Sequence, residues 1–175
     1  MLPVERAGRE RAVAAVLRQS GAARMVAREL LAAFGAPDAV LPRGEHGPVW
    51  PPGIVGSLAH DREFAVAAVA ARHAVRGLGI DIEPAEPLPD GLVTCVTTEA
   101  ERRRYPLALL QSRLFFVVKE AVYKALNPLD GRFLGFDDVD IDLDAGVARA
   151  VSGASARVRF ALVPRVIAIA YVPTD

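Results

Sequence analysis

The segment GLGIDIEP, residues 77–84, sets the strongest constraint on how this chain can fold. Its apolar residues are typical of a buried β-strand, yet Asp81 and Glu83 lie on it two residues apart. Side chains alternate between the faces of a strand, so both carboxylates point to the same side. Two such carboxylates repel each other unless a cation lies between them. We therefore expect a cation site here, and a strand end that emerges into solvent before Pro84 is the alternative.

A second charged group lies on an apolar helix that we expect from about residue 107 to residue 126. In its segment LFFVVKEAVYKAL, Glu120 and Lys124 are four residues apart and share one face of the helix, while Lys119 and Tyr123 form a neighbouring pair. A solvated Glu–Lys pair is the simplest explanation. However, a charged strip on such an apolar helix needs a partner inside the protein.

The two groups together suggest a metal site. Asp81, Glu83 and Glu120 would form a three-carboxylate site of the kind that holds Mg²⁺, whose shell is commonly completed by substrate phosphates. Lys119 and Lys124 would then neutralise a bound phosphate. A zinc site is disfavoured, because one cysteine and three scattered histidines give no zinc-ligand spacing.

The segment WPPGIVGSLAHD, residues 50–61, supplies a third candidate group. Ser57 and His60 lie near the end of a glycine-containing strand, where backbone N–H groups and a histidine could bind an anion. Ser57, His60 and Asp61 do not form a hydrolase triad, because the chain lacks the G-x-S-x-G elbow and residues so close in sequence rarely reach triad geometry. A structural histidine near a turn is the alternative for His60.

Hydrophobic patterning predicts a chain of mixed helices and strands. A helix is expected over residues 5–34, with Gly21 as a break, then a proline-rich loop over 36–53 and a connection over 86–96. A capping box from Thr98 to Glu101 should begin a helix that Pro106 interrupts, and Asn127-Pro128 should end the next one. Strands are expected over residues 54–58, 63–71, 75–84, 139–143, 147–151, 156–163 and 165–172.

Composition limits the class of protein. A length of 175 residues with 52% hydrophobic content is typical of one packed domain. The 21 basic and 21 acidic residues balance, which argues against a dedicated nucleic-acid binder. The single cysteine, Cys95, allows no internal disulfide, and no secretory signal or membrane-spanning run is evident. We expect a soluble, cytoplasmic protein with no membrane or nucleic-acid partner.

Taken together, these segments resemble the phosphopantetheinyl transferases of the Sfp-like and EntD-like branch. The motifs occur in the expected order: W-P-x-G-x-x-G-S-x-x-H from Trp50 to His60, G-x-D-x-E from Gly79 to Glu83, and F-x-x-K-E-x-x-Y-K from Phe116 to Lys124. The segment NPLDGRFLGFDDVDIDLD that follows also resembles this branch.

The resemblance implies an α+β fold with pseudo-twofold symmetry. A single domain, residues 1–175, would contain two similar halves, about 1–84 and 85–175, each with a small, mainly antiparallel sheet packed on helices. Coenzyme A would bind in the cleft between them. A weak internal similarity between DREFAVAAVA and VPRVIAIAYV agrees with such a repeat, although two ordinary strands can look alike by chance.

The resemblance also implies an activity, which is transfer of the 4′-phosphopantetheine arm of coenzyme A to a serine of an acyl or peptidyl carrier protein, with release of 3′,5′-ADP. Asp81, Glu120 and Lys124 would carry the catalysis, with Glu120 taking the serine proton. The ligands of Mg²⁺, for which Mn²⁺ is the alternative, would be Asp81, Glu83 and Glu120. The coenzyme A contacts would be Lys119, Lys124, Ser57, His60, Arg24, Arg28, Arg43 and His46.

The expected partner is an acidic carrier protein of polyketide, nonribosomal peptide or siderophore biosynthesis, bound by a monomer. Arg102-Arg103-Arg104 with Tyr105 and the apolar residues 107–110 form the candidate docking surface, and an ordinary solvated helix end is the alternative. Two other functions stay open. One is a Mg²⁺-dependent nuclease or phosphohydrolase. The other is a non-catalytic homologue that binds coenzyme A or a carrier, since the N-terminal part is shorter than is usual in this branch.

Overall fold

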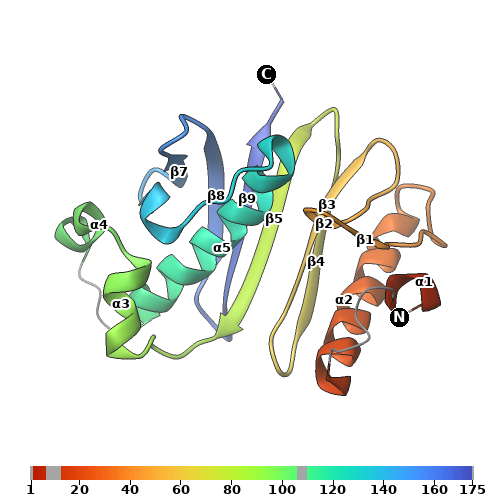
Figure 1. Ribbon diagram of the computed structural model, residues 1–175, viewed down its shortest axis with the longest axis horizontal. Helices are drawn as coiled ribbons and strands as arrows, with labels where there is room; N and C mark the ends of the chain where they lie inside the picture. The colour runs from red at the N-terminus through yellow and green to blue at the C-terminus, as the bar shows by residue number, and fades with distance from the viewer. Residues whose placement is uncertain (1, 7–12, 106–109, 175) are drawn as a thin grey trace.

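The computed structural model describes residues 2–6, 13–105 and 110–174, and it is an α+β fold (Figure 1). The N-terminal elements are α1 (Pro3–Arg6), α2 (Ala14–Ala32), β1 (Arg43–Gly44), β2 (Gly47–Pro48), β3 (Ile54–His60) and β4 (Ala65–Ala71). They are followed by β5 (Val75–Pro84), α3 (Asp90–Val96), α4 (Glu99–Arg104), α5 (Leu110–Asp130), a 3₁₀ turn (Phe136–Asp138), β6 (Val139–Asp142), β7 (Val147–Ala150), β8 (Ser155–Ala161) and β9 (Arg165–Pro173). No helix in the described ranges is long and apolar enough to cross a membrane.

The strands form three antiparallel sheets, which confirms the expected fold class. β1 pairs with β2, β3 pairs with β4, and the largest sheet has the order β5-β9-β8-β7-β6. All seven predicted strands are present, with ends that shift by a few residues. β5 belongs to the first half of the predicted division at residue 84, but its hydrogen-bonded partner is β9.

Alternation along β5 and β9 places a different neighbour on each face of the sheet. The residues of β9 from Val166 to Val172 that face α5 are buried with α5 in the main core, and Figure 1 shows α5 lying along β5 and β9. On the other face, Ile80 and Ile82 pack against Ala59 of β3. The β3–β4 hairpin therefore contacts the large sheet through a small apolar cluster.

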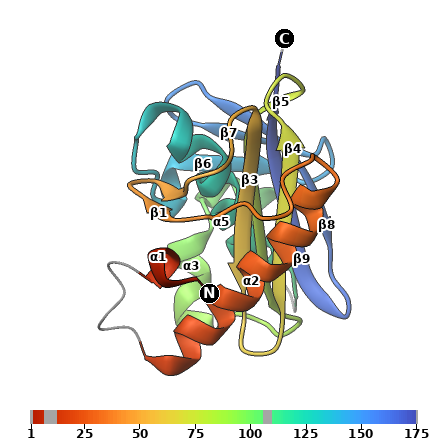
Figure 2. The same cartoon turned by 90° about the vertical axis from the view of Figure 1, so that its right-hand side faces the viewer.

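The outer side of the β3–β4 hairpin is covered by α2, as Figure 2 shows. A separate apolar cluster formed by Ala27, Leu31, Leu41 and Ile54 holds these elements together. Gly21 does not break α2, contrary to expectation, because it lies buried within one continuous helix. A single interior glycine costs a helix only about 1 kcal/mol, which packing of a helix this long outweighs.

Two further predictions about helices were wrong. Residues 90–96 form α3 rather than a connection, and Val96 of this helix is buried in the main core. Asn127-Pro128 does not end α5, which continues to Asp130. Pro128 lies in the last turn of α5, and Gly131, with a φ of 70°, closes the helix by donating its N–H to the Asn127 carbonyl at 2.8 Å.

One helix prediction was confirmed, and others concern residues that the structure does not describe. The capping box predicted at Thr98 is formed, with Thr98 and Glu101 exchanging hydrogen bonds at the start of α4. The beginning of the helix expected at residue 107, the break at Pro106 and part of the helix expected over residues 5–34 lie outside the described residues.

Two glycines allow α5 to lie directly on β5. A Cβ atom at Gly79 would be 1.9 Å from the Ala121 carbonyl oxygen, and one at Gly77 would be 2.3 Å from the Ala125 carbonyl oxygen. Both distances are far below van der Waals contact, so any other residue would push the helix away from the strand. Gly77, Gly79 and Asp81 point to the same face of β5. The close contact at the glycines therefore also brings α5 next to the Asp81 carboxylate.

We predict that Gly79→Ala destabilises the protein by about 1–3 kcal/mol, because overpacking at this contact must displace α5. Thermal and denaturant unfolding measure this loss. Gly91→Ala is the matched control, because Gly91 lies in α3 and no described atom is within 4 Å of its added Cβ. Equal stabilities of the two variants would show that the close approach of α5 is not needed.

Candidate active site

The packing of α5 on β5 brings Lys124 to Asp81, which lie 43 residues apart in sequence. Lys124 Nζ is 2.6 Å from Asp81 Oδ1 and also donates to the Ile80 carbonyl at 3.2 Å. Asp81 is only 8% exposed, so its charge is largely withdrawn from water. The ammonium group of Lys124 therefore neutralises part of a negative charge that the fold buries.

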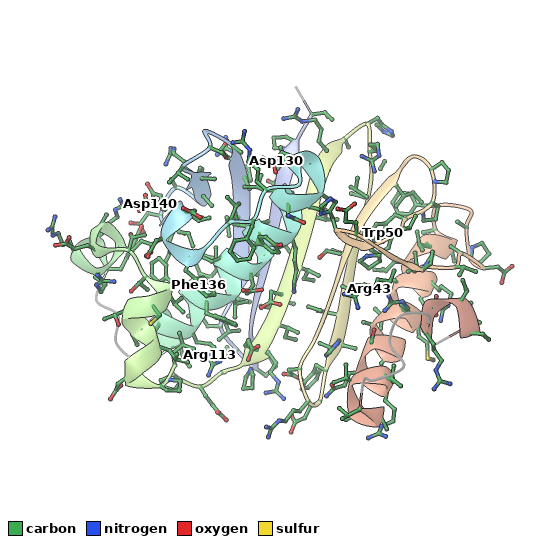
Figure 3. All side chains as sticks on the ribbon, viewed as in Figure 1. Arg43, Trp50, Arg113, Asp130, Phe136 and Asp140 are labelled. Carbon is green, nitrogen blue, oxygen red and sulfur yellow. The ribbon has the colours of Figure 1, made fainter. Side chains whose placement is uncertain are left out.

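Glu83 is held by an arginine that sequence reasoning missed. Arg113 NH1 lies 3.3 Å from Glu83 Oε2, and the same guanidinium donates to the carbonyls of Glu86 and Pro87. Figure 3 shows Arg113 beside the end of β5. The available signal was spacing, because Arg113 precedes Glu120 by seven residues and so lies on the same helix face, two turns earlier.

The pKa values of the three carboxyl groups are all shifted upward by the fold. Burial is the largest cause that raises the pKa of Asp81, of Glu83 and of Glu120. The charge of Asp81 raises the pKa of the other two further, while Lys124 opposes the shift at each of them. These three side chains therefore share one electrostatic environment, and that environment favours added positive charge.

The donor chemistry of these residues fits a hard cation, which takes carboxylate oxygens. In the described parts of the chain, however, no group of three or more acidic, histidine or cysteine side chains is already gathered closely enough to hold an ion. The Lys124 ammonium at Asp81 is the cation that the structure itself supplies. The metal-ligand role of Asp81, Glu83 and Glu120 thus stays a prediction.

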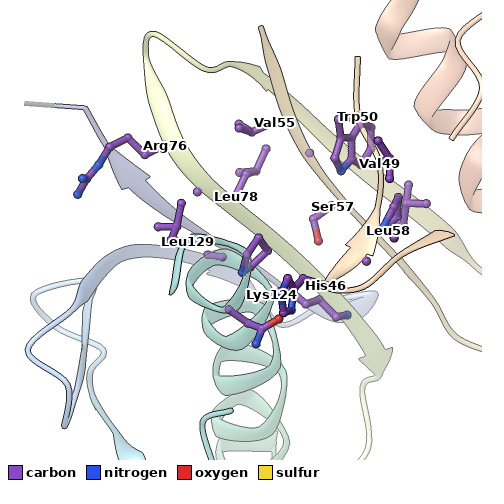
Figure 4. Close-up of a pocket in the computed structure, with 18 of the residues that line it drawn as sticks. His46, Val49, Trp50, Val55, Ser57, Leu58, Arg76, Leu78, Lys124 and Leu129 are labelled. Carbon is purple, nitrogen blue, oxygen red and sulfur yellow. The ribbon is translucent and has the colours of Figure 1, made fainter. Parts of the chain in front are cut away.

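Two adjoining cavities collect most of the predicted coenzyme A contacts. The larger, about 370 Å³, lies between the β1–β2 segment, β3, β5 and α5, and it is lined by His46, Ser57 and Lys124 (Figure 4). The smaller, about 270 Å³, is lined by Arg24, Arg43 and His60. Both include residues of the β1–β2 segment from Gly44 to Pro48, so this segment forms their common wall.

The two arginines of α2 differ in what they contact. Arg24 is 2% exposed and donates to Ser20 Oγ at 2.6 Å and to the Leu41 carbonyl at 3.0 Å, while it also lines the smaller cavity. Arg28 instead pairs with Glu5, with 2.8 Å between its NH1 atom and the carboxylate Oε1. The lining residues of the two cavities include Arg24 but do not include Arg28.

Lys119 lies on a different side of α5 from Lys124, because five residues correspond to a rotation of about 140° around a helix. Its Nζ is 2.8 Å from Glu101 Oε2 and donates to the Phe136 carbonyl. Burial lowers the pKa of Lys119, whereas its bond to Glu101 opposes that shift. Lys119 lines a third cavity, of about 310 Å³, together with Glu120 and Tyr123. The structure thus separates it from the pair formed by Asp81 and Lys124.

The candidate docking arginines of α4 make contacts within the chain. Arg103 pairs with Glu99, Arg104 pairs with Asp140, and Arg102 donates to the Thr97 carbonyl. Residues 107–109 of the proposed surface lie outside the described ranges. Carrier docking at this surface stays a prediction.

Comparisons with known proteins agree with the motif order. A family model described as "4'-phosphopantetheinyl transferase superfamily" matches residues 77–170, which is more than half of the chain. A model described as "4'-phosphopantetheinyl transferase N-terminal domain" matches residues 5–70.

Three curated relatives are similar over a large part of the chain. The 4'-phosphopantetheinyl transferase PptT of Mycobacterium tuberculosis (strain ATCC 25618 / H37Rv) is 44% identical over 126 residues, which are 69% of this chain and 56% of the relative. The 4'-phosphopantetheinyl transferase Npt of Nocardia iowensis is 42% identical over 75% of this chain and 61% of the relative, and Svp of Streptomyces mobaraensis is 40% identical over 83% and 63%. The chain spans less than two thirds of the length of these relatives.

We predict that Glu120→Gln stabilises the protein at neutral pH in the absence of divalent cations. The folded state raises the pKa of Glu120 above its ordinary value of 4.5, so folding favours the protonated form. The stabilising effect of that proton is complete below pH 4.5 and is lost as the pH rises through the raised pKa. The uncharged amide avoids both the burial of a charge and its repulsion by Asp81, and each kcal/mol gained in this way should raise Tm by about 2–4 °C.

Thermal melts of both proteins across pH 4 to 8, in the presence of a chelator, test this prediction. The difference in Tm should vanish at the acidic end and grow toward neutral pH. A variant that is less stable than the parent at pH 8 would show that the Glu120 carboxylate is stabilised, rather than repelled, by its surroundings.

Proposed function

The chain belongs to the 4'-phosphopantetheinyl transferase superfamily, and from this we propose that it transfers the 4′-phosphopantetheine arm of coenzyme A to a serine of an acyl or peptidyl carrier protein. The observation that supports this most directly is the ion pair between Asp81 and Lys124, because Lys124 lines the larger of two adjoining cavities with basic walls. The family assignment disfavours the alternative of a nuclease or phosphohydrolase. The experiment below distinguishes an active transferase from a non-catalytic homologue.

The proposed reaction exchanges one phosphorus–oxygen bond for another. The serine oxygen of the carrier forms a bond to the β-phosphorus of coenzyme A, the bond from that phosphorus to the bridging oxygen breaks, and 3′,5′-ADP leaves with the bridging electron pair. The serine proton must go to a base. Glu120 suits this task, because its raised pKa makes its carboxylate a stronger proton acceptor than an ordinary glutamate.

Basic residues on the two cavity walls would hold the phosphates of coenzyme A. Arg24, Arg43 and His60 line the smaller cavity and would bind phosphate groups of the nucleotide. Lys124 reaches from α5 into the larger cavity, so it would exchange its bond to Asp81 for a pyrophosphate oxygen as charge builds there. Asp81, Glu83 and Glu120 would hold Mg²⁺, for which Mn²⁺ is the alternative, and this ion when bound would offset pyrophosphate charge.

The finer features of this function rest on the sequence. A cytoplasmic location and a monomeric state are proposed from composition and from the family resemblance, and the proposed carrier belongs to polyketide, nonribosomal peptide or siderophore biosynthesis. An acidic carrier remains the proposed partner, because the family acts on such proteins.

We predict that a purified apo carrier protein incubated with this chain, coenzyme A and Mg²⁺ gains the mass of one phosphopantetheine group, measured by intact-protein mass spectrometry. A chelator should abolish the gain, and so should Asp81→Asn, because Lys124 and the cation both depend on that carboxylate. Asp38→Asn is the matched control, since Asp38 is an exposed aspartate of the loop after α2.

Two other results would contradict the proposal in different ways. Coenzyme A binding without modification of several unrelated carriers would identify a non-catalytic homologue. Cleavage of coenzyme A at the same rate with and without a carrier would identify a phosphohydrolase.

A further inference from the structure

Arg165, the first residue of β9, contacts the turn that joins β3 to β4. Its Nε lies 3.4 Å from Asp61 Oδ2, its NH2 pairs with the carboxylate of Glu63, and its guanidinium is 4.6 Å from the centre of the Phe64 ring. All three partners belong to residues 61–64, which are about a hundred residues away in sequence. One side chain thus connects the β3–β4 hairpin to the large sheet by two ion pairs and a cation–π contact.

The turn is built so that Asp61 presents one oxygen to Arg165. Asp61 Oδ1 accepts hydrogen bonds from the N–H groups of Glu63 and Phe64, both at 2.7 Å, which fixes the side chain. The other oxygen, Oδ2, is buried and accepts no hydrogen bond from any described residue, and the Asp61 side chain is only 5% exposed. A buried carboxylate requires a compensating charge, and Arg165 supplies it.

Both ends of the contact between Arg165 and the turn lie next to residues of the candidate active site. Asp61 directly follows His60, which ends β3 and lines the smaller cavity. In the large sheet, Arg165 is paired with Pro84, and its neighbour Val166 is paired with Glu83. His60, Asp61, Glu83 and Arg165 line one further cavity, of about 660 Å³, which therefore opens where the hairpin meets the sheet.

The contact surface between the hairpin and the large sheet is apolar. Its buried members are Ala59, Ile80 and Ile82, joined by the partly buried residues Val66, Ala68, Ile167 and Ile169. Apolar packing holds the hairpin against the sheet, but it is non-directional, so it does not fix the position of the turn in the way that ion pairs to one side chain do. In addition, the hairpin and the large sheet are separate hydrogen-bonded sheets in the described chain.

We propose that Arg165 is a positioning residue that clamps the β3–β4 turn to β9 and so fixes His60 relative to Asp81 and Glu83. This inference rests on the proposed function, because it assigns His60 to coenzyme A. Arg165 acts through His60 and the turn rather than through contact with the substrate. The clamp sets how far the phosphate-binding side chains of the hairpin lie from the carboxylates of β5.

The test compares three variants by coenzyme A binding, measured by calorimetry in the presence of Mg²⁺. Arg165→Met keeps a long side chain over Phe64 without charge, and it should weaken binding by about tenfold, because the turn that follows His60 is no longer held to β9. Arg165→Lys keeps the charge without the planar fork and should restore part of the affinity. Arg157→Met removes the same charge from the exposed face of β8 and should bind like the parent.

A second readout needs no ligand. In ligand-free Arg165→Met, the amides of Glu63 and Phe64 should exchange their hydrogens at least about tenfold faster, while amides of β8 and β9 keep their protection. A general stabilising role would instead accelerate exchange throughout the sheet, and that result would overturn the proposal. Unchanged coenzyme A affinity, or unchanged exchange at the turn, would also overturn it.

The two readouts separate this proposal from the proposed function. If the unaltered chain does not bind coenzyme A, the proposed function fails, and hydrogen exchange at the turn alone decides whether Arg165 is a clamp. If the chain binds coenzyme A without transferring its arm, calorimetry still tests the clamp. If Arg165→Met does not fold, Arg165→Lys carries both measurements, with a smaller expected effect in the same direction.

Discussion

The structure depends on the direct contact between α5 and β5 that Gly77 and Gly79 permit. A Cβ atom at either position would collide with a carbonyl oxygen of the helix. Because the helix backbone lies against the strand backbone, side chains of β5 and α5 near this contact come within hydrogen-bonding distance of each other. Asp81 on the strand reaches Lys124 on the helix at 2.6 Å, and Arg113 reaches Glu83 at 3.3 Å. The same contact that completes the main core therefore assembles the candidate active site.

This assembly places the chain under electrostatic stress that suits a phosphate-transfer site. Burial raises the pKa of Asp81, Glu83 and Glu120, repulsion by Asp81 raises the pKa of Glu83 and Glu120 further, and Lys124 opposes the shift at all three. Sites of this kind trade stability for function, because the groups that repel one another in the free protein are those that bind charge during the reaction. The hairpin side of the site depends on a different support, the ion pairs that Arg165 of β9 makes with the β3–β4 turn.

Much of the fold could be predicted, because strand alternation and the capping box at Thr98 are local signals. The ends of helices were less predictable, because α5 passes through Pro128 and closes only at Gly131, whose positive φ is a conformation that the sequence around Pro128 does not specify. The site was predictable where residues share one face, as Glu120 and Lys124 do. It was not predictable where partners come from distant segments. Lys119 faces Glu101 and Arg28 faces Glu5, and no spacing within α5 or α2 reveals either partner.

Binding of Mn²⁺, measured by electron paramagnetic resonance, tests most directly whether the carboxylates of β5 and α5 together hold one cation. Mn²⁺ takes the same oxygen ligands as Mg²⁺ and gives a signal when free. With coenzyme A present, we predict one tight Mn²⁺ site per chain. Asp81→Asn on β5 and Glu120→Gln on α5 should each weaken it by at least about tenfold, whereas Asp38→Asn should leave it unchanged. Full-strength binding by either site variant would contradict the claim that strand and helix carboxylates share the ion.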